Sequence, residues 1–176
     1  MSRINYDLQT IRALAFDIDG VLSPTVVPMG PDGVPQRMAN LKDGYAMVQA
    51  VRKGLKIVIV SGALCPGLRE RFHVIGLSDD DINLNVSDKL TVLREWAARN
   101  GMSSQEIAYV GDDIPDLGPM RWAGLAVAPR DACSECRALA GFITLANGGY
   151  GVARELIEEV MRTQGTWPAY STSAGY

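Results

Sequence analysis

Short apolar runs alternate along the chain with segments whose apolar side chains recur at helical spacing. The runs are typical of buried strands, and the segments are typical of helices that bury one face. Strands are therefore predicted at residues 13–16, 55–60, 82–86, 107–110, 125–128 and 142–144. Helices are predicted at residues 43–54, 66–76, 89–100, 117–123 and 152–161, with one more after Asp131.

Local signals mark where several of these elements begin and end. Asp43 is a candidate N-cap and Gly54 a helix stop, while Pro66 is suited to the first turn of the next helix. Pro31-Asp32-Gly33 is a turn signal, which predicts a β-hairpin over residues 25–39 that projects from the body. The acidic run at residues 79–81 is interpreted as a solvated loop.

Strands that alternate with helices predict an α/β fold with a mostly parallel sheet, covered by helices on both faces and joined by right-handed crossovers. This is a Rossmann-like, three-layer, doubly wound architecture with a projecting hairpin. The length of 176 residues suits one domain, predicted over residues 1–164. Residues 165–176, rich in Ser, Thr and Gly, are predicted to form a C-terminal tail.

Composition narrows the class of protein. The formal net charge of -3 argues against a general nucleic-acid binder, and no apolar run approaches the length of a membrane span. Three cysteines do not make an even disulfide framework, so a reducing cytoplasm fits best. The pair Cys133-x-x-Cys136 lacks further zinc ligands, and it is interpreted as structural rather than redox-active. The single histidine, His73, has no evident acidic partner in the sequence and is also interpreted as structural.

Three predicted strands end in polar residues: Asp17 and Asp19 after the first, Ser61 after the second, and Asp112 with Asp113 after the fourth. Because parallel strands share one carboxyl edge, these side chains are expected to gather there, where such folds bind ligands. Buried acids need a cationic partner, and carboxylate oxygens suit Mg²⁺. For the first strand alone, a polar turn is an equally good interpretation.

Four motifs together resemble those of the haloacid-dehalogenase-like phosphatases. They are Asp17-x-Asp19-Gly20, Ser61-Gly62, Lys89 at a helix start, and Gly111-Asp112-Asp113-x-x-Asp116. The resemblance implies that Asp17 is the nucleophile, Asp19 the general acid and base, and Ser61 and Lys89 catalytic partners of the phosphate. It implies Mg²⁺ held by Asp17, the Asp19 carbonyl, Asp112 and Asp113, with Asp116 orienting Lys89 or capping a helix.

Further segments are similar to the 3-deoxy-D-manno-octulosonate 8-phosphate phosphatases, a capless family. They are Leu41-Lys42-Asp43-Gly44-Tyr45, Arg71 before Ile75-Gly76-Leu77, Asp88-Lys89, Asn147-Gly148-Gly149-Tyr150-Gly151 and Gln164-Gly165-Thr166-Trp167. No cap domain fits between the motifs. The resemblance implies a Mg²⁺-dependent sugar acid phosphatase of lipopolysaccharide precursor biosynthesis, acting as a homotetramer whose subunits complete each other's sites.

One position departs from that family. Its members usually carry Ser/Thr-Gly-Arg at the second motif, whereas this chain has Ala63. The substrate-binding set is therefore predicted as Ser61 and Gly62, with Lys42, Arg69 or Arg71 for the substrate's carboxylate. Three alternatives stay open: a phosphatase for a nine-carbon keto-sugar acid 9-phosphate, a non-catalytic assembly domain of the same fold, and a receiver domain, whose motif order fits poorly.

Overall fold

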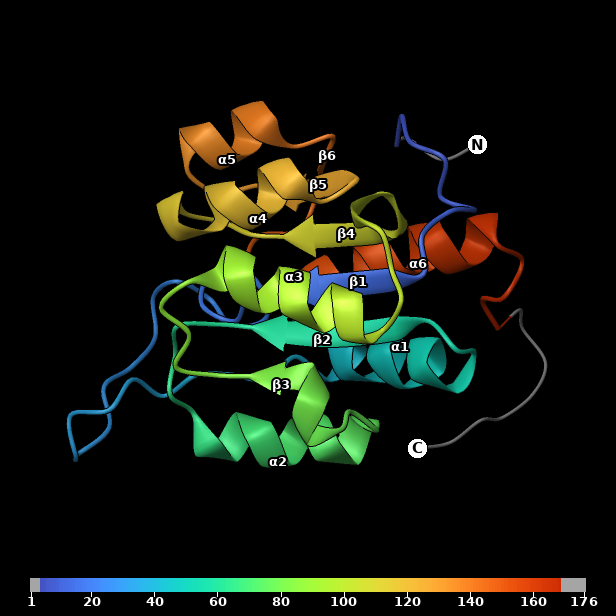
Figure 1. Cartoon of the computed structure of the whole chain (residues 1–176). Helices are drawn as coiled ribbons and strands as arrows, with labels where there is room; N and C mark the ends of the chain where they lie inside the picture. Colours follow the sequence, from blue (N-terminus) through green and yellow to red (C-terminus); the bar gives the residue numbers. More distant parts are fainter. Residues whose placement is uncertain (1–3, 169–176) are drawn as a thin grey trace.

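Six strands form one open sheet in the computed structural model, which describes residues 4–168 (Figure 1). The spatial order is β3-β2-β1-β4-β5-β6, and each neighbouring pair is parallel. Their bounds are β1 Ala13–Phe16, β2 Lys56–Val60, β3 Ile82–Asn83, β4 Ile107–Val110, β5 Leu125–Ala128 and β6 Phe142–Ile143. The chain order reverses between β1 and β4, so the topological switch point lies at their carboxyl ends.

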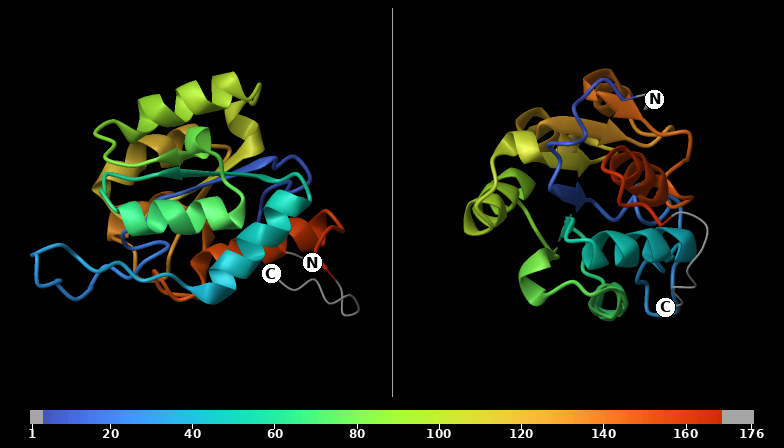
Figure 2. Two further views of the ribbon diagram at one scale, coloured as in Figure 1. Left: turned by 90° about the horizontal axis from the view of Figure 1, so that it is seen from below. Right: turned by 90° about the vertical axis from the view of Figure 1, so that its right-hand side faces the viewer.

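Residues 4–168 form six α-helices, which lie in two layers, one on each face of the sheet (Figure 2). They are α1 Leu41–Arg52, α2 Pro66–Ile75, α3 Lys89–Arg99, α4 Leu117–Trp122, α5 Ser134–Leu139 and α6 Val152–Thr163. Buried side chains of α1, α2 and α6 share one core cluster, and those of α3, α4 and α5 belong to the other. The predicted three-layer, doubly wound fold is confirmed.

The alternation of β1 explains both layers. Leu14 and Phe16 point into the core beneath α1 and α6, whereas Ala13 and Ala15 point toward α3 and its buried Trp96. Every residue of this strand is fully buried. The carboxyl end of this strand is therefore held rigidly, and this fixes the position of Asp17, the residue that follows it.

The start of α1 differs from the prediction. Asn40, rather than Asp43, is the N-cap, and its side-chain oxygen accepts from the Lys42 amide at 2.9 Å. Asp43 lies in the first turn of the helix, where its Oδ1 accepts from the Arg154 amide of α6 at 2.7 Å. Burial raises the pKa of Asp43 to about 6. The prediction missed this role because the partner lies more than a hundred residues away in the chain.

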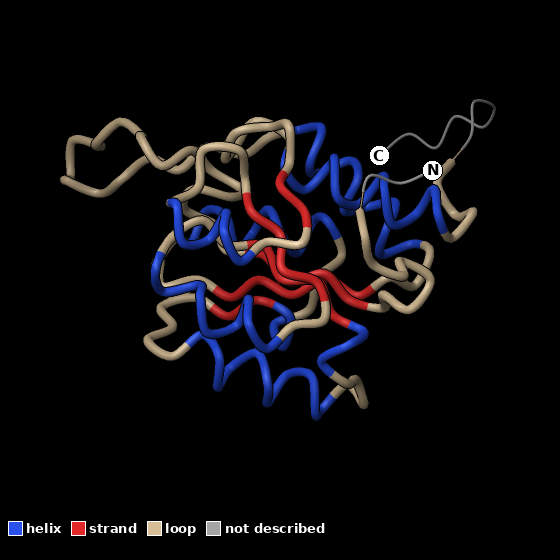
Figure 3. Tube along the Cα trace, turned by 90° about the horizontal axis from the view of Figure 1, so that it is seen from above, coloured by secondary structure: helices blue, strands red, loops and turns tan. Residues whose placement is uncertain are grey.

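Residues 25–39, here called the projecting loop, extend from the carboxyl edge of the sheet (Figures 1 and 3). The predicted turn is present: the Gly30 amide donates to the Val34 carbonyl at 2.8 Å, and the Gln36 amide donates to the Pro28 carbonyl at 2.8 Å. The predicted strands on either side are wrong as regular strands, since one isolated bridge joins Met29 and Pro35. The prolines supply no amide donors, which limits the ladder.

The segment around β3 also departs from the prediction. The strand ends at Asn83 rather than at residue 86, and Asn85 adopts a left-handed conformation with φ 57°. The acidic run is solvated as predicted at Asp79 and Asp80, but it forms a 3-10 helix, Asp79–Asp81, rather than a loop. Asp81 accepts from the Trp96 indole at 3.0 Å, and Asp79 pairs with Arg69 at 2.8 Å. These acids therefore tie β3 to α2 and α3.

The first residues of the predicted tail pack against the body. The Trp167 amide donates to the Met161 carbonyl at 3.1 Å, and the Arg154 guanidinium lies 4.6 Å from the centre of the Trp167 ring. The rest of that predicted tail, residues 169–176, lies outside the described residues. Among the helices of residues 4–168, none has the length and apolar character that crossing a bilayer requires.

Candidate active site

A cavity of about 380 Å³ opens at the carboxyl ends of β1 and β4, where the topology predicts a ligand site. The structure brings together there the polar residues predicted from the strand ends. Its lining includes Asp17, Asp19, Ser61, Gly62, Lys89, Asp112, Asp113 and Asp116, together with Ala63 and Thr25 of the projecting loop. The site is thus assembled from the ends of separate strands and from the first residue of α3.

Asp17 stands at the floor of the cavity, directly after β1. Its Oδ1 accepts from the Ile18 amide at 2.6 Å, and its Oδ2 accepts from the Lys89 ammonium at 2.6 Å. The nearby Ser61 side chain lowers the pKa of this carboxylate. Burial and the nearby Asp116 raise the pKa of Asp17 to about 6, although Lys89 opposes the shift. The carboxylate is therefore fixed in place with one oxygen near a cation.

Asp116 holds Lys89 from the other side. Its Oδ1 accepts from the Lys89 ammonium at 2.7 Å and from the Tyr109 hydroxyl at 2.7 Å. Its Oδ2 accepts from the amides of Asp112 and Asp113 at 3.1 and 3.3 Å. Burial lowers the pKa of Lys89, but the carboxylates of Asp17 and Asp116 raise it by more, so its pKa lies above the usual range. These contacts agree with the prediction that Asp116 orients Lys89, the first of its two expected roles.

Arg37, which sequence reasoning missed, pairs with the other predicted catalytic acid. Its Nε donates to Asp19 Oδ1 at 2.7 Å and its Nη2 donates to Asp19 Oδ2 at 2.8 Å. Asp19 raises the pKa of Arg37 through these bonds, against the effect of burial. The side chain comes from the projecting loop and is largely buried. The sequence gives no signal for this contact, because the direction of an arginine side chain in a loop cannot be inferred from helical or strand periodicity.

Carboxylate oxygens of Asp17, Asp112 and Asp116 lie within 4.8 Å of one another, a spacing that suits a metal ion. Asp116 is already saturated by four donors, which leaves Asp17 and Asp112 as side-chain ligands. Burial, and then Asp116 and Asp17, raise the pKa of Asp112 to about 7. Gly20, at φ +75°, has no side chain, and a Cβ there would collide with the Asp112 carboxylate. These residues fit Mg²⁺.

Asp113 lies farther out than the predicted ligand set implies. Its side chain accepts from the Ile114 amide at 2.8 Å and caps a short 3-10 helix, Ile114–Asp116. It lines the cavity but does not belong to the acidic cluster found among the described residues. Direct coordination by Asp113 and by the Asp19 carbonyl stays a prediction.

Mg²⁺ affinity is expected to fall as the pH drops from about 8 to about 5. Asp17 and Asp112 have pKa values raised to about 6 and about 7, so below that range each holds a proton that the metal must displace. Calorimetric titration with Mg²⁺ in two buffers of different ionisation enthalpy measures both the affinity and the protons released. An affinity that does not change over this range would contradict the assignment of these two acids.

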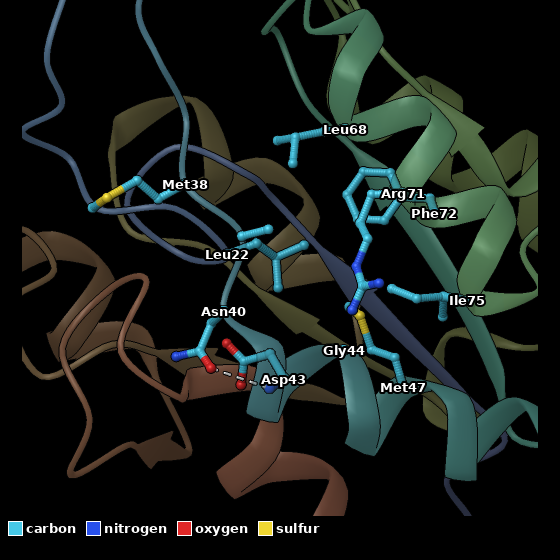
Figure 4. A pocket seen from close by; sticks show the side chains of 11 residues that line it. Leu22, Met38, Asn40, Asp43, Gly44, Met47, Leu68, Arg71, Phe72 and Ile75 are labelled. Atoms are coloured by element: carbon cyan, nitrogen blue, oxygen red, sulfur yellow. Dashed lines mark hydrogen bonds between the residues drawn. The ribbon is translucent and has the colours of Figure 1, made fainter. Parts of the chain in front are cut away.

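Three predicted substrate-binding cations lie outside the lining of this cavity. Arg69 is held by Asp79 and by the Ile82 carbonyl. Arg71 points into a separate, mainly apolar pocket beside Gly44 of α1, where its Nη2 is buried and finds no hydrogen-bond partner among the described residues (Figure 4). Lys42 is exposed on the first turn of α1. Within one chain, Arg37 rather than these residues reaches the catalytic acids.

His73 also lies away from the cavity. Its Nδ1 is 3.1 Å from the Leu77 carbonyl at the end of α2. The expectation that it lacks an acidic partner is wrong, because its Nε2 lies 3.4 Å from Asp79. That partner joins α2 to the following 3-10 helix, so the interpretation of His73 as structural agrees with its position.

Comparisons with known proteins agree with this architecture. Residues 76–156 match the haloacid dehalogenase-like hydrolase family. The 3-deoxy-D-manno-octulosonate 8-phosphate phosphatase of Yersinia pestis is 30% identical over 88% of this chain and 81% of its own length. The corresponding Escherichia coli K12 protein is 30% identical over 89% and 82%. The structure of the Moraxella catarrhalis phosphatase, solved with magnesium, phosphate and KDO, matches with a TM-score of 0.85 and 29% identity over 91% of both chains.

Proposed function

The chain belongs to the haloacid dehalogenase-like family of 3-deoxy-D-manno-octulosonate 8-phosphate phosphatases, and from this premise we propose that it hydrolyses that sugar acid phosphate to the free sugar acid and phosphate. The observation that carries the proposal is the Asp17 carboxylate. It ends the central strand β1, opens onto the cavity, and is bracketed by Lys89 and Ser61. A fixed carboxylate beside a fixed cation suits a phosphoryl acceptor.

Asp17 attacks phosphorus, and the bond from phosphorus to the sugar oxygen breaks. The product on the protein is an aspartyl-phosphate, which water then cleaves. Lys89 and Ser61 lie beside the Asp17 carboxylate, so they also face the oxygens of a phosphoryl group that approaches it. When bound at Asp17 and Asp112, Mg²⁺ supplies positive charge to the transferring phosphoryl group. Five acids line or border the cavity, and without added positive charge they would repel a phosphate dianion.

Asp19 handles the protons of both steps in this proposal. It gives a proton to the leaving sugar oxygen and later takes one from the attacking water. In the described arrangement both of its oxygens accept from Arg37, and this cation favours the ionised form of Asp19 over the protonated form that a general acid needs. In this proposal Arg37 therefore moves away from Asp19 during turnover. The incoming substrate's carboxylate is a suitable partner for the freed guanidinium. Arg37 would thus take the place of the arginine that the family usually has at the position of Ala63.

The setting of the enzyme is also part of the proposal. We infer a cytoplasmic homotetramer, active in lipopolysaccharide precursor biosynthesis, in which neighbouring subunits cover the open cavity. The projecting loop supports this arrangement, because four of its apolar side chains are exposed: Val26, Met29, Val34 and Met38. Several exposed apolar side chains on one short segment favour contact with another protein surface.

A phosphate-release assay with Mg²⁺ and matched substrates tests the proposed function. Turnover of 3-deoxy-D-manno-octulosonate 8-phosphate is expected to exceed that of a nine-carbon keto-sugar acid 9-phosphate and of an aldose phosphate without a carboxylate. The reverse preference between the two acids would assign the enzyme to the nine-carbon substrate. Absence of hydrolysis of every phosphate, with Mg²⁺ bound, would favour the non-catalytic assembly domain instead.

Replacement of Arg37 by Ala is expected to raise the KM for the sugar acid phosphate about tenfold with a smaller change in kcat. The reason is that the lost contact binds the substrate's carboxylate before and during reaction alike. For an aldose phosphate the rise should be much smaller. Arg37→Lys, which keeps the charge without the two-pronged geometry, should lie between.

Lys42→Ala is the matched control, because it removes an exposed cation that does not line the cavity. Steady-state kinetics on both substrates give the KM and kcat of the parent and of each variant. Equal KM increases for the acid and the aldose phosphate in Arg37→Ala would contradict carboxylate recognition by Arg37.

A further inference from the structure

Cys133 and Cys136 lie directly behind the acidic loop that ends β4. Cys133 precedes α5, and Cys136 occupies its first turn. The Cys133 amide donates to the Asp112 carbonyl at 2.8 Å, and the Cys136 thiol donates to the Asp113 carbonyl at 3.3 Å. The proposed reaction uses neither thiol, although both residues hold the backbone on which Asp112 is carried.

The spacing of the two cysteines brings them together at the start of one helix. A side chain at the N-cap position lies near the backbone of the second and third helical residues, and the third residue of α5 is Cys136. Cys133 has a non-helical backbone at φ -57°, ψ 159°, as is usual for the residue that caps the start of a helix. Cys136 is fully buried, whereas Cys133 is partly exposed. An oxidant can therefore reach the Cys133 sulfur, and the buried Cys136 sulfur is the nearby thiol that can react with the oxidised product.

We propose that Cys133 and Cys136 form a reversible disulfide that weakens Mg²⁺ binding at Asp112, a redox role in place of the purely structural one assigned to this pair from the sequence. With a peroxide as oxidant, the Cys133 sulfur attacks one peroxide oxygen and the O–O bond breaks. This yields a sulfenic acid at Cys133 and one water. The Cys136 sulfur then displaces the hydroxyl of the sulfenic acid, forming the S–S bond and a second water. A dithiol reductant reverses the change by taking the two sulfurs back to thiols.

The coupling to the metal follows from the lost S–H group. Once its sulfur is in a disulfide, Cys136 has no hydrogen to donate, and the Asp113 carbonyl loses that partner. The shift of Cys136 toward Cys133 also pulls on the amide that holds the Asp112 carbonyl. Partners behind a metal ligand set its orientation, and their loss lowers metal affinity by about tenfold or more. The inference rests on Asp112 as a ligand but not on the identity of the sugar.

The test starts from Cys65→Ser, which leaves this pair as the only cysteines. Treatment with hydrogen peroxide, or with glutathione disulfide, should remove two hydrogen atoms from the intact mass and protect both thiols from alkylation. Calorimetric titration should then show Mg²⁺ affinity about tenfold lower in the oxidised protein, with recovery after dithiothreitol. The comparison uses one polypeptide in two redox states, so it does not depend on the folding of a new variant.

Cys136→Ser in the same background is the control. Its hydroxyl can still donate to the Asp113 carbonyl but cannot form a disulfide, so its Mg²⁺ affinity should match the reduced parent and ignore the oxidant. Two outcomes would overturn the proposal. One is that both thiols remain open to alkylation after oxidation, and the other is that the disulfide forms while Mg²⁺ affinity stays unchanged.

Discussion

Phosphate release by Asp17→Asn should fall about 10³-fold or more, because an amide oxygen cannot serve as the phosphoryl acceptor. The fold around it should persist. The amide oxygen can still accept from Ile18, and Lys89 keeps Asp116 as its second partner. Acid quenching with radiolabelled substrate should trap phosphoenzyme in the parent protein and none in the variant. At saturating Mg²⁺ the loss is expected chiefly in kcat, because the variant lacks the phosphoryl acceptor while Lys89 remains to attract the phosphate.

Asp80→Asn is the matched control for this change, because Asp80 is exposed on the Asp79–Asp81 turn and does not line the cavity. Its turnover should equal that of the parent. Asp19→Asn gives a second comparison, since it should slow the reaction without removing the phosphoryl acceptor. If Asp17→Asn were to retain label on the protein, another residue would have to be the nucleophile.

Much of the site is predictable because its parts are local. Asp17, Ser61 and Asp112 each follow a buried strand, so the hydrophobic pattern places them at one edge without knowledge of any side-chain contact. Lys89 follows the helix cap Asp88, whose side chain accepts from the Thr91 amide as its sequence position suggests. Strand order and capping therefore determine where these groups stand.

The contacts that escaped prediction are long-range or come from irregular backbone. Arg37 reaches Asp19 from a loop whose path is set by prolines and a single bridge, so no periodicity aims it. Asp43 looks like a helix cap in sequence, but its partner is an amide of α6. In the sequence Tyr109 is an ordinary residue of a buried strand, yet its hydroxyl donates a hydrogen bond to Asp116, seven positions later. Such pairings become visible only when the layers are assembled.

Asp116→Asn is expected to be the most destabilising conservative change near the site, by about 3 kcal/mol in the free energy of unfolding. Both oxygens of Asp116 accept, from Lys89 and Tyr109 on one side and from two backbone amides on the other. An asparagine places an NH₂ group against one of these sets of donors, whichever way the amide is turned. It also leaves a buried ammonium with Asp17 as its remaining acidic partner.

Tyr109→Phe gives the graded comparison, because it removes one donor from the same carboxylate and should lower stability by about 1 kcal/mol. Urea unfolding of the three proteins at pH 7 measures both values. Turnover should fall further in Asp116→Asn than in Tyr109→Phe, since only the former loosens Lys89 from its place on Asp17. Equal stability losses in the two variants would mean that Asp116 acts as a single hydrogen-bond acceptor. In that case the negative charge of Asp116 would not be what holds Lys89 next to the loop that carries Asp112 and Asp113.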